Sequence, residues 1–281
     1  MGLALLVAAW GAPSSLRAEP LSWTSLDTGL AVTVWRPGET CPDVDGLLIV
    51  DIDPESYQFA VHNYADEGLK APVMLEQWRL RTGHVVLFNA GLFTPDLAYM
   101  GLLSKDGRIL SRRQHPSWHG LFVAEPESPH ERTKARIVDL REAHAERPTR
   151  GYREAAQALM LIDRVGTIRV RHTGKFAHQT IIAETREGHI RLVKTLGLVT
   201  LYGIAECLRG GLTDISVAMA MDGGSSSDLL VAPSVWKAAG LSDREQTWKE
   251  LFAGSSTAHI PLPTVIGLSR RGPAGVTVPG K

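Results

Sequence analysis

Ten short runs of apolar or alternating residues divide the chain, and they limit its fold more than any other feature. Runs of roughly four to eight such residues, bounded by turn-forming residues, are typical of β-strands. Pairs such as Asp106-Gly107 and Glu187-Gly188 separate several of them. The predicted strands are 30–35, 46–52, 58–62, 85–88, 120–124, 158–162, 167–171, 180–184, 190–195 and 216–221.

Helical patterns are fewer than strand patterns. They predict helices at 72–81, 202–208, 234–239 and 243–252. No regular alternation of strand and helix is present, so the pattern indicates an α+β fold. We expect a single domain with a mixed, largely antiparallel β-sheet and a few flanking helices.

Two stretches have the composition of loops. The range 125–150 is charged and carries three prolines, which favours a mobile insertion, although 136–140 could be a strand. The range 271–281 reads as a tail rich in glycine and proline.

The charge balance excludes some partners. Lys+Arg and Asp+Glu each number 30, so the formal net charge is zero. A nucleic-acid surface requires a basic excess, and none is present. The ten histidines have no HExxH or Cys/His ligand spacing, which argues against a structural zinc site. No segment approaches about 18 consecutive apolar residues, so no transmembrane span is predicted.

The first 18 residues differ from the rest of the chain. A small apolar run, a Gly-Ala-Pro break and Leu16-Arg17-Ala18 resemble a secretory signal peptide, although a basic start is missing. The alternatives are a buried strand or a disordered tail. We expect an exported protein, periplasmic or secreted, with residues 19–281 as its domain.

Two cysteines bear on the same question. Cys41 and Cys207 could pair if the protein is exported. Cys207 lies in a predicted helix, however, and nothing in the sequence brings Cys41 near it. The sequence therefore favours a buried free thiol at Cys207.

The stretch AMAMDGGSSSDLLV, residues 218–231, is the strongest candidate for a functional site. A buried strand runs into Asp222, and the glycines and serines that follow can form an anion-binding nest of backbone amides. The stretch is neither a P-loop nor a nucleophile elbow, because their glycine, lysine and serine spacings are absent. Asp222 could serve as an acid, a base, a nucleophile or an oxygen ligand to a metal. The alternative is a tight structural turn.

Two earlier segments share this design. The run 85–88 delivers Asn89 to a strand end, followed by Gly91, and Gly101 opens a second such segment. An asparagine amide can hold a sugar hydroxyl or a phosphate oxygen. Taken alone, Asn89 is better explained as the cap of a turn.

The order of these segments resembles the phosphodiester glycosidase family, over about residues 45–270. The family's Asn-Gly-Gly-x-Phe and Asn-Leu-Asp-Gly-Gly-Gly-Ser-Ser motifs are similar to two stretches here. The matching segments are Asn89-Ala-Gly91-Leu-Phe93, Lys175 to Thr180, the predicted helix with Glu206, Ala220 to Ser227, and Pro263 to Leu268.

The resemblance implies an exported hydrolase that cleaves the glycosidic bond of a sugar-1-phosphodiester or a related envelope glycan. It implies Asp222 as a catalytic carboxylate or the orienter of the attacking water, Glu206 as the second carboxylate and His178 as an acid. Glu206 could equally be the partner of a helix N–H or an arginine, and His178 could be a structural hydrogen-bonding residue. The residues that it places at the substrate are Asn89, Gly91, Gly101, Gln179, Gly223, Gly224, Ser225 and Ser226. A divalent cation, Ca or Mg, could bind near Asp222.

One departure from the family pattern favours a second interpretation. The family has an arginine where this chain has Gln179, and arginine is the residue that binds phosphate bidentately. Lys175, Arg171 or Arg169 could replace that charge. The alternative function is a non-catalytic envelope protein that binds a glycan or a phosphodiester polymer, with a role in exopolysaccharide or cell-envelope biology.

Overall fold

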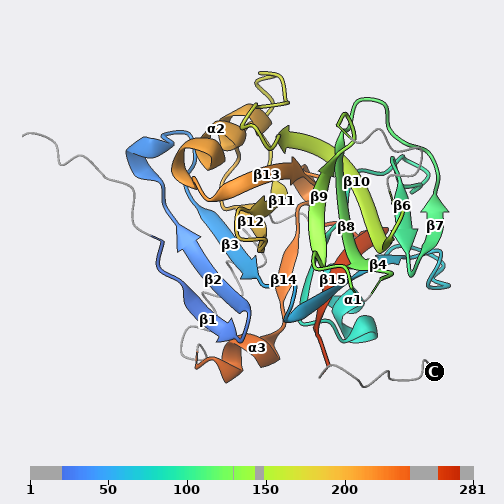
Figure 1. The fold of residues 1–281 in the computed structure, drawn as a ribbon. Coiled ribbons are helices and arrows are strands. Elements are labelled where there is room, and N and C mark those ends of the chain that lie inside the picture. The colour runs from blue at the N-terminus through green and yellow to red at the C-terminus, as the bar shows by residue number, and fades with distance from the viewer. Residues whose placement is uncertain (1–20, 129, 143–148, 241–258, 273–281) are drawn as a thin grey trace, which may run out of the picture.

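Two β-sheets pack face to face in the computed structural model, which describes residues 21–128, 130–142, 149–240 and 259–272 (Figure 1). The larger sheet has the order β1-β2-β3-β12-β11-β13-β10-β6-β7, with β8 on β10 and β9 on β8. Its strands are β1 (Thr24–Asp27), β2 (Leu30–Trp35), β3 (Leu47–Ile52), β6 (Leu103–Lys105), β7 (Arg108–Ser111), β8 (Gly120–Pro126), β9 (Ala135–Asp139), β10 (Tyr152–Ile162), β11 (Thr180–Thr185), β12 (Ile190–Thr195) and β13 (Ile215–Ala220).

The smaller sheet has the order β14-β5-β15-β4. Its strands are β4 (Tyr57–Asn63), β5 (Val86–Asn89), β14 (Leu229–Val231) and β15 (Thr264–Arg270). Every strand pair in the described part of the chain is antiparallel. The predicted α+β class therefore holds broadly, but the sheets dominate more strongly than a mixed fold suggests.

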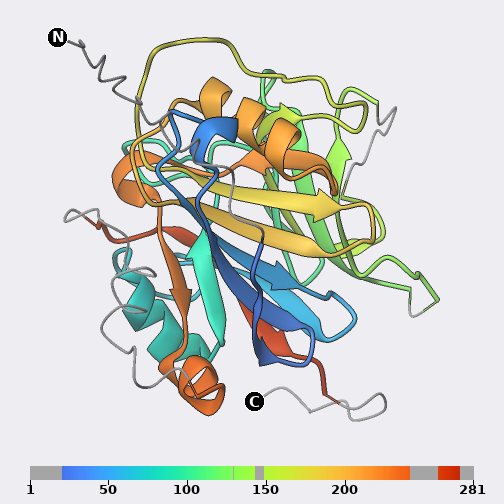
Figure 2. The ribbon, with the colours of Figure 1, turned by 90° about the vertical axis from the view of Figure 1, so that its left-hand side faces the viewer.

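The helices lie outside the two sheets. They are α1 (Leu75–Thr82), α2 (Leu201–Gly211) and α3 (Pro233–Ala238), with a short 3-10 turn at Gly38–Thr40. Helix α2 covers the outer face of the larger sheet, and α1 lies beside the smaller sheet (Figure 2). These helices match three of the predicted ranges; the fourth, 243–252, lies outside the described residues.

Most predicted strands are present with shifted ends. The prediction at 167–171 is wrong, because only an isolated bridge joins Ile162 and Ile168 there. The segment around it forms no ladder, although alternation alone suggested one. Strand β9 occupies part of the stretch 125–150, so that stretch is not simply a mobile insertion. The range 271–281 lies almost wholly outside the described residues.

The main core fills the space between the sheets. Alternate residues of β13 divide between two clusters, because successive side chains of a strand face opposite sides. Val217 and Met219 join the cluster between the sheets, whereas Ala218 and Ala220 pack under α2. This parity decides which face of the sheet each residue near a strand end occupies.

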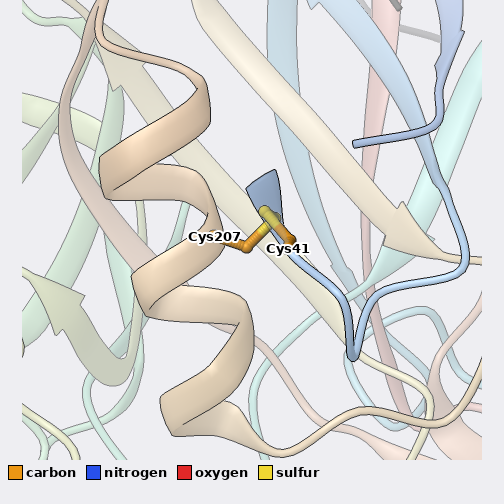
Figure 3. The surroundings of a disulfide bond; sticks show 2 residues. All are labelled: Cys41 and Cys207. Atoms are coloured by element: carbon orange, nitrogen blue, oxygen red, sulfur yellow. A yellow bond between two sulfur atoms is a disulfide. The ribbon is translucent and has the colours of Figure 1, made fainter. Parts of the chain in front are cut away.

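A disulfide joins Cys41, just after the 3-10 turn, to Cys207 on α2 (Figure 3). The two Cα atoms lie 5.3 Å apart, although 166 positions separate them in the sequence. The sequence-based preference for a free thiol at Cys207 is therefore wrong. The packing of α2 onto the larger sheet brings the two cysteines together, and no local pattern encodes that contact.

None of the described helices has the length and hydropathy to cross a membrane. The predicted signal peptide, 1–18, lies outside the described residues.

Removing the disulfide should destabilise the protein by about 2–4 kcal/mol, because a cross-link over so long a loop restricts the unfolded chain. The test is urea unfolding of the Cys41→Ala/Cys207→Ala double variant against the wild type, oxidised and reduced. The reduced wild type should match the variant. An oxidised wild type no more stable than the variant would contradict the prediction.

Glu154 gives the fold a pH dependence. The side chain is 3% exposed, and burial raises its pKa to about 7 despite hydrogen bonds from the Val61 and Asp106 N–H groups. The native state therefore holds a proton that the unfolded chain releases above its ordinary pKa of 4.5. This contribution is fully present below that value and is lost as pH rises through about 7, by about 3 kcal/mol at most.

Glu154→Gln should flatten this part of the stability curve. The measurement is the free energy of unfolding from pH 4.5 to 8 for both proteins, compared as a difference so that other titrating groups cancel. Parallel curves would show that Glu154 does not titrate in this window.

Candidate functional site

The candidate site is the loop that leaves β13 and enters β14. The loop runs from Met221 to Asp228 and includes a 3-10 turn at Gly224–Ser226. Because β13 belongs to the larger sheet and β14 to the smaller one, this loop crosses between the sheets. The stretch of glycines and serines that follows Asp222 is therefore part of the connection between the two sheets.

Asn89 fastens both ends of this loop. The side chain is 1% exposed at the end of β5. Its Nδ2 donates to the Asp222 carbonyl at 2.7 Å, and its Oδ1 accepts from the Asp228 N–H at 3.0 Å. Its amide is thus engaged inside the protein, and its role is to hold the loop.

Asp222 sits half-buried at the start of the loop. Its backbone N–H donates to the Ala90 carbonyl at 3.1 Å. Burial raises the pKa of its carboxyl, and hydrogen bonds from the Ser226 side chain and the Gly223 N–H oppose part of that rise. The result is a partly accessible carboxyl that holds its proton to higher pH than an ordinary aspartate.

The segment before β11 lies against the glycines of the loop. The half-buried His178 accepts a hydrogen bond on its carbonyl from the Gly224 N–H at 2.8 Å. A Cβ on Gly223 would lie 2.8 Å from Gln179 Oε1, so only glycine fits there without a shift. Gly224 has φ +66°, which also favours glycine. The amides of Gly223 and Gly224 are both used within the protein and do not form an open nest.

Gln179, at the position where the resemblance implies an arginine, is buried. Its Nε2 donates to the carbonyls of Ala177 and Val199 at 3.4 and 3.5 Å. Of the predicted replacements, Arg169 is tied to Asp139 and Asp163 at 2.8 and 3.1 Å. Arg171 and Lys175 are exposed.

Gly91 and Gly101 serve close packing around Tyr99 and Gln157. A Cβ on Gly91 would meet the Tyr99 hydroxyl at 2.5 Å, and one on Gly101 would meet the Gln157 side chain at 3.1 Å. The Tyr99 hydroxyl accepts from the Gly91 N–H and donates to the Gln157 carbonyl at 2.7 Å. Both glycines therefore allow Tyr99 and Gln157 to pack closely against the backbone of this segment.

The structure does not join Glu206 to this loop through any contact in the described part of the chain. Glu206 is exposed on α2, next to the disulfide-bonded Cys207. Ser225 is exposed, whereas Ser226 is buried. Among the described residues, no group of three or more His, Cys, Asp or Glu side chains is placed to hold a metal ion, so the cation near Asp222 stays a prediction.

Sequence reasoning missed a buried polar cluster at the far end of the loop. Lys194, 1% exposed on β12, lies 3.6 Å from Asp228, and His259 lies 3.3 Å from the same carboxylate. Burial lowers the pKa of Lys194, and the Asp228 charge opposes that shift. Asp228 directly follows the serines, which was the one available signal; Lys194 and His259 lie too far along the chain to be linked to it.

Three cavities in the described part of the chain lie away from Asp222. Their volumes are about 370, 600 and 300 Å³, and Asp222 lines none of them. Asp228 and His259 line the first, together with apolar residues of α1, β14 and α3.

The phosphodiester glycosidase family model matches residues 82–268, which is more than half of the chain and includes both Asn89 and the crossing loop. The chain belongs to the phosphodiester glycosidase family. No curated protein sequence matches it significantly.

The solved structures that share the fold include the following two. The zebrafish N-acetylglucosamine-1-phosphodiester alpha-N-acetylglucosaminidase catalytic domain, auto-inhibited by its pro-peptide, is 14% identical with a TM-score of 0.56, over 92% of this chain and 84% of that one. A hypothetical protein from Synechocystis is 12% identical with a TM-score of 0.57, over 90% of this chain and 64% of that one. At these identities the likeness concerns the fold alone.

Asn89→Ala should loosen the crossing loop and destabilise the protein by about 2–4 kcal/mol, because a buried N–H and a buried carbonyl lose their partner. Asn63→Ala is the matched control: Asn63 also ends a strand and accepts from the Ala65 and Asp66 N–H groups. Hydrogen exchange should quicken at 222–228 only in the Asn89 variant. Unchanged exchange there would show that Asn89 does not hold the loop.

Proposed function

We propose that this family member is a hydrolase that cleaves the glycosidic bond of a sugar-1-phosphodiester, with Asp222 as its catalytic carboxylate. The observation that carries the proposal is the placement of Asp222: a half-buried carboxyl with a raised pKa, at the strand end that the family motif marks. A raised pKa makes the carboxylate a stronger base near neutral pH.

In the proposed reaction, Asp222 accepts a proton from the attacking water as the water oxygen bonds to the sugar C1. The bond from C1 to the phosphate oxygen breaks, and a phosphomonoester leaves with the bonding electrons. That leaving group is stable as an anion, so the step needs little acid assistance. One well-placed carboxylate can therefore serve where other glycosidases use two.

The buried contacts around Asp222 support its positioning. Asn89 fixes the Asp222 carbonyl, and Ala90 fixes its N–H. The Ser226 hydroxyl and the Gly223 N–H orient the carboxyl itself. Preorganisation of this kind spares the reaction the cost of arranging the base.

The disulfide supports an exported location. Disulfides persist in oxidising compartments and are rare in the cytosol. The pairing of Cys41 with Cys207 therefore accords with the signal-peptide pattern of residues 1–18. We place the protein in the periplasm or outside the cell.

A second candidate function is a non-catalytic protein that binds a glycan or a phosphodiester polymer. The observation that favours it is that Asp222 caps its own turn through Gly223 and Ser226. The buried, neutral Gln179 at the family's arginine position points the same way. A carboxylate that only caps a turn needs no substrate.

Asp222→Asn should lower the rate of hydrolysis by about 10²–10⁴-fold. The substrates are nitrophenyl glycosides and a phenyl phosphodiester of α-N-acetylglucosamine-1-phosphate. Asp53→Asn is the matched control, because Asp53 also caps its own turn, accepting from the Glu55 N–H at 2.9 Å and the Ser56 hydroxyl at 2.8 Å. Only the Asp222 variant should lose activity.

Glu206→Gln tests the sequence-predicted second carboxylate in the same assay. A loss equal to that of Asp222→Asn would place Glu206 in the reaction. Activity that survives in Asp222→Asn would overturn the assignment of Asp222. A folded wild type that binds these compounds without turnover would favour the binding protein.

A further inference from the structure

Gln157 holds two loops together, the one that ends at Leu102 and the one that runs from His115 to Trp118, and these two loops are called the wall below. The side chain is fully buried on β10. Its Oε1 accepts from the Leu102 and His115 N–H groups at 3.0 and 2.9 Å, and its Nε2 donates to the carbonyls of His115 and Trp118. One amide thus fixes the end of the 91–102 loop and the start of the approach to β8.

This wall stands beside Asp222. The ladder between β10 and β13 reaches Leu159 and Ala220, and beyond it the Gln157 N–H donates to the Leu102 carbonyl instead. Ala220 packs under α2 and Met221 packs between the sheets, and continued alternation would put Asp222 on the outer face.

Gln157 shares that outer face. Its neighbours Ala156 and Ala158 both pack between the sheets, so Gln157 points the other way. The register that pairs Leu159 with Ala220 sets position 157 opposite position 222, although the ladder itself ends before that point. The Tyr99 hydroxyl links the two regions: it accepts from the N–H of Gly91, the neighbour of Ala90, and donates to the Gln157 carbonyl.

The second loop of the wall carries a pair of stacked aromatic rings. The rings of His115 and Trp118 stack with centroids 3.8 Å apart and an interplanar angle of 16°, and both residues are half-buried. His115 Nδ1 accepts from the Ser117 N–H at 3.3 Å, so in the neutral imidazole the proton is on Nε2. Burial and the nearby Arg113 charge lower the pKa of His115, which favours the neutral ring.

We propose that His115 and Trp118 form a sugar-binding platform beside Asp222, on which one apolar face of a pyranose ring stacks. The inference rests on the proposed function and adds the means of recognition. A pyranose presents C–H groups on one face and hydroxyls at its rim. The aromatic faces can pack against the C–H groups, and the His115 Nε2–H can donate a hydrogen bond to a hydroxyl at the rim.

The platform recognises the ring of the sugar and not the charge of the phosphate. This matters because Gln179 replaces the family's arginine and is engaged with Ala177 and Val199. Affinity then comes from stacking that Gln157 holds rigid. The expected ligands are hexose-1-phosphates and their diesters, in preference to sugar-free phosphodiesters.

The test compares Trp118→Ala, Trp118→Phe and a matched control, Trp23→Ala. Trp23 is a 36% exposed indole that stacks on Arg191 at 5.2 Å, near the opposite edge of the larger sheet. We expect Trp118→Ala to raise KM for the sugar phosphodiester about tenfold with kcat nearly unchanged, while Trp118→Phe and Trp23→Ala stay near the wild type. Thermal unfolding checks that each variant folds.

Binding calorimetry separates this inference from the proposed function. The probes are the 1-phosphates of α-N-acetylglucosamine, α-glucose and α-mannose, titrated into the wild type, Trp118→Ala and His115→Ala. Turnover by the wild type with an unchanged KM in Trp118→Ala would overturn the platform and leave the hydrolase standing. Sugar binding without turnover, lost in Trp118→Ala, would support the platform in a binding protein. A folded wild type that neither binds nor hydrolyses any probe would overturn both.

Discussion

The buried amide of Asn89 is the contact on which the rest of the site depends. It ends a strand of the smaller sheet and holds, through one donor and one acceptor, both ends of a loop that descends from the larger sheet. A buried amide left unpaired is costly, so this contact holds the crossing loop to the end of β5. The glycines and serines of the motif follow from that constraint, because the chain has to turn sharply within a crowded polar space.

The same constraint assigns the polar groups of the loop to different tasks. The amides of Gly223 and Gly224 and the hydroxyl of Ser227, which bonds with Thr180 at 2.8 Å, are engaged within the protein. Asp228 points toward Lys194 and His259, between the sheets. Asp222 accepts hydrogen bonds from the Ser226 side chain and the Gly223 N–H and retains partial access to solvent. The crossing loop thus separates a carboxylate that pairs with Lys194 and His259 from one that retains partial access to solvent.

The sequence predicted the local parts of this arrangement well and the long-range parts poorly. Alternating runs such as 30–35 and 190–195 coincide with β2 and β12, since their periodicity is a local property. The motif drew attention to Asp222 and Asn89, but not to the fact that one holds the other, because 133 positions separate them. The sequence did not predict the disulfide or the contacts of Lys194 and Gln157 for the same reason. The order of the strands in the sheets brings these residues to their partners, and no short sequence pattern encodes that order. Strands β6, β7 and β14 are each three or four residues long, too short to show a period.

The neutral residue at position 179 removes a positive charge that could bind the phosphate of a substrate. An arginine there would supply a charge for phosphate, whereas the amide of Gln179 is directed to two backbone carbonyls. Arg169 does not replace the charge, because Asp139 and Asp163 already neutralise it. A half-buried carboxyl such as Asp222 also repels a phosphate that approaches it directly. In the proposed binding mode, a substrate that carries both a sugar and a phosphate has its sugar ring over His115 and Trp118 and its phosphate toward solvent. The proposed cleavage then requires C1 of the sugar to lie next to Asp222.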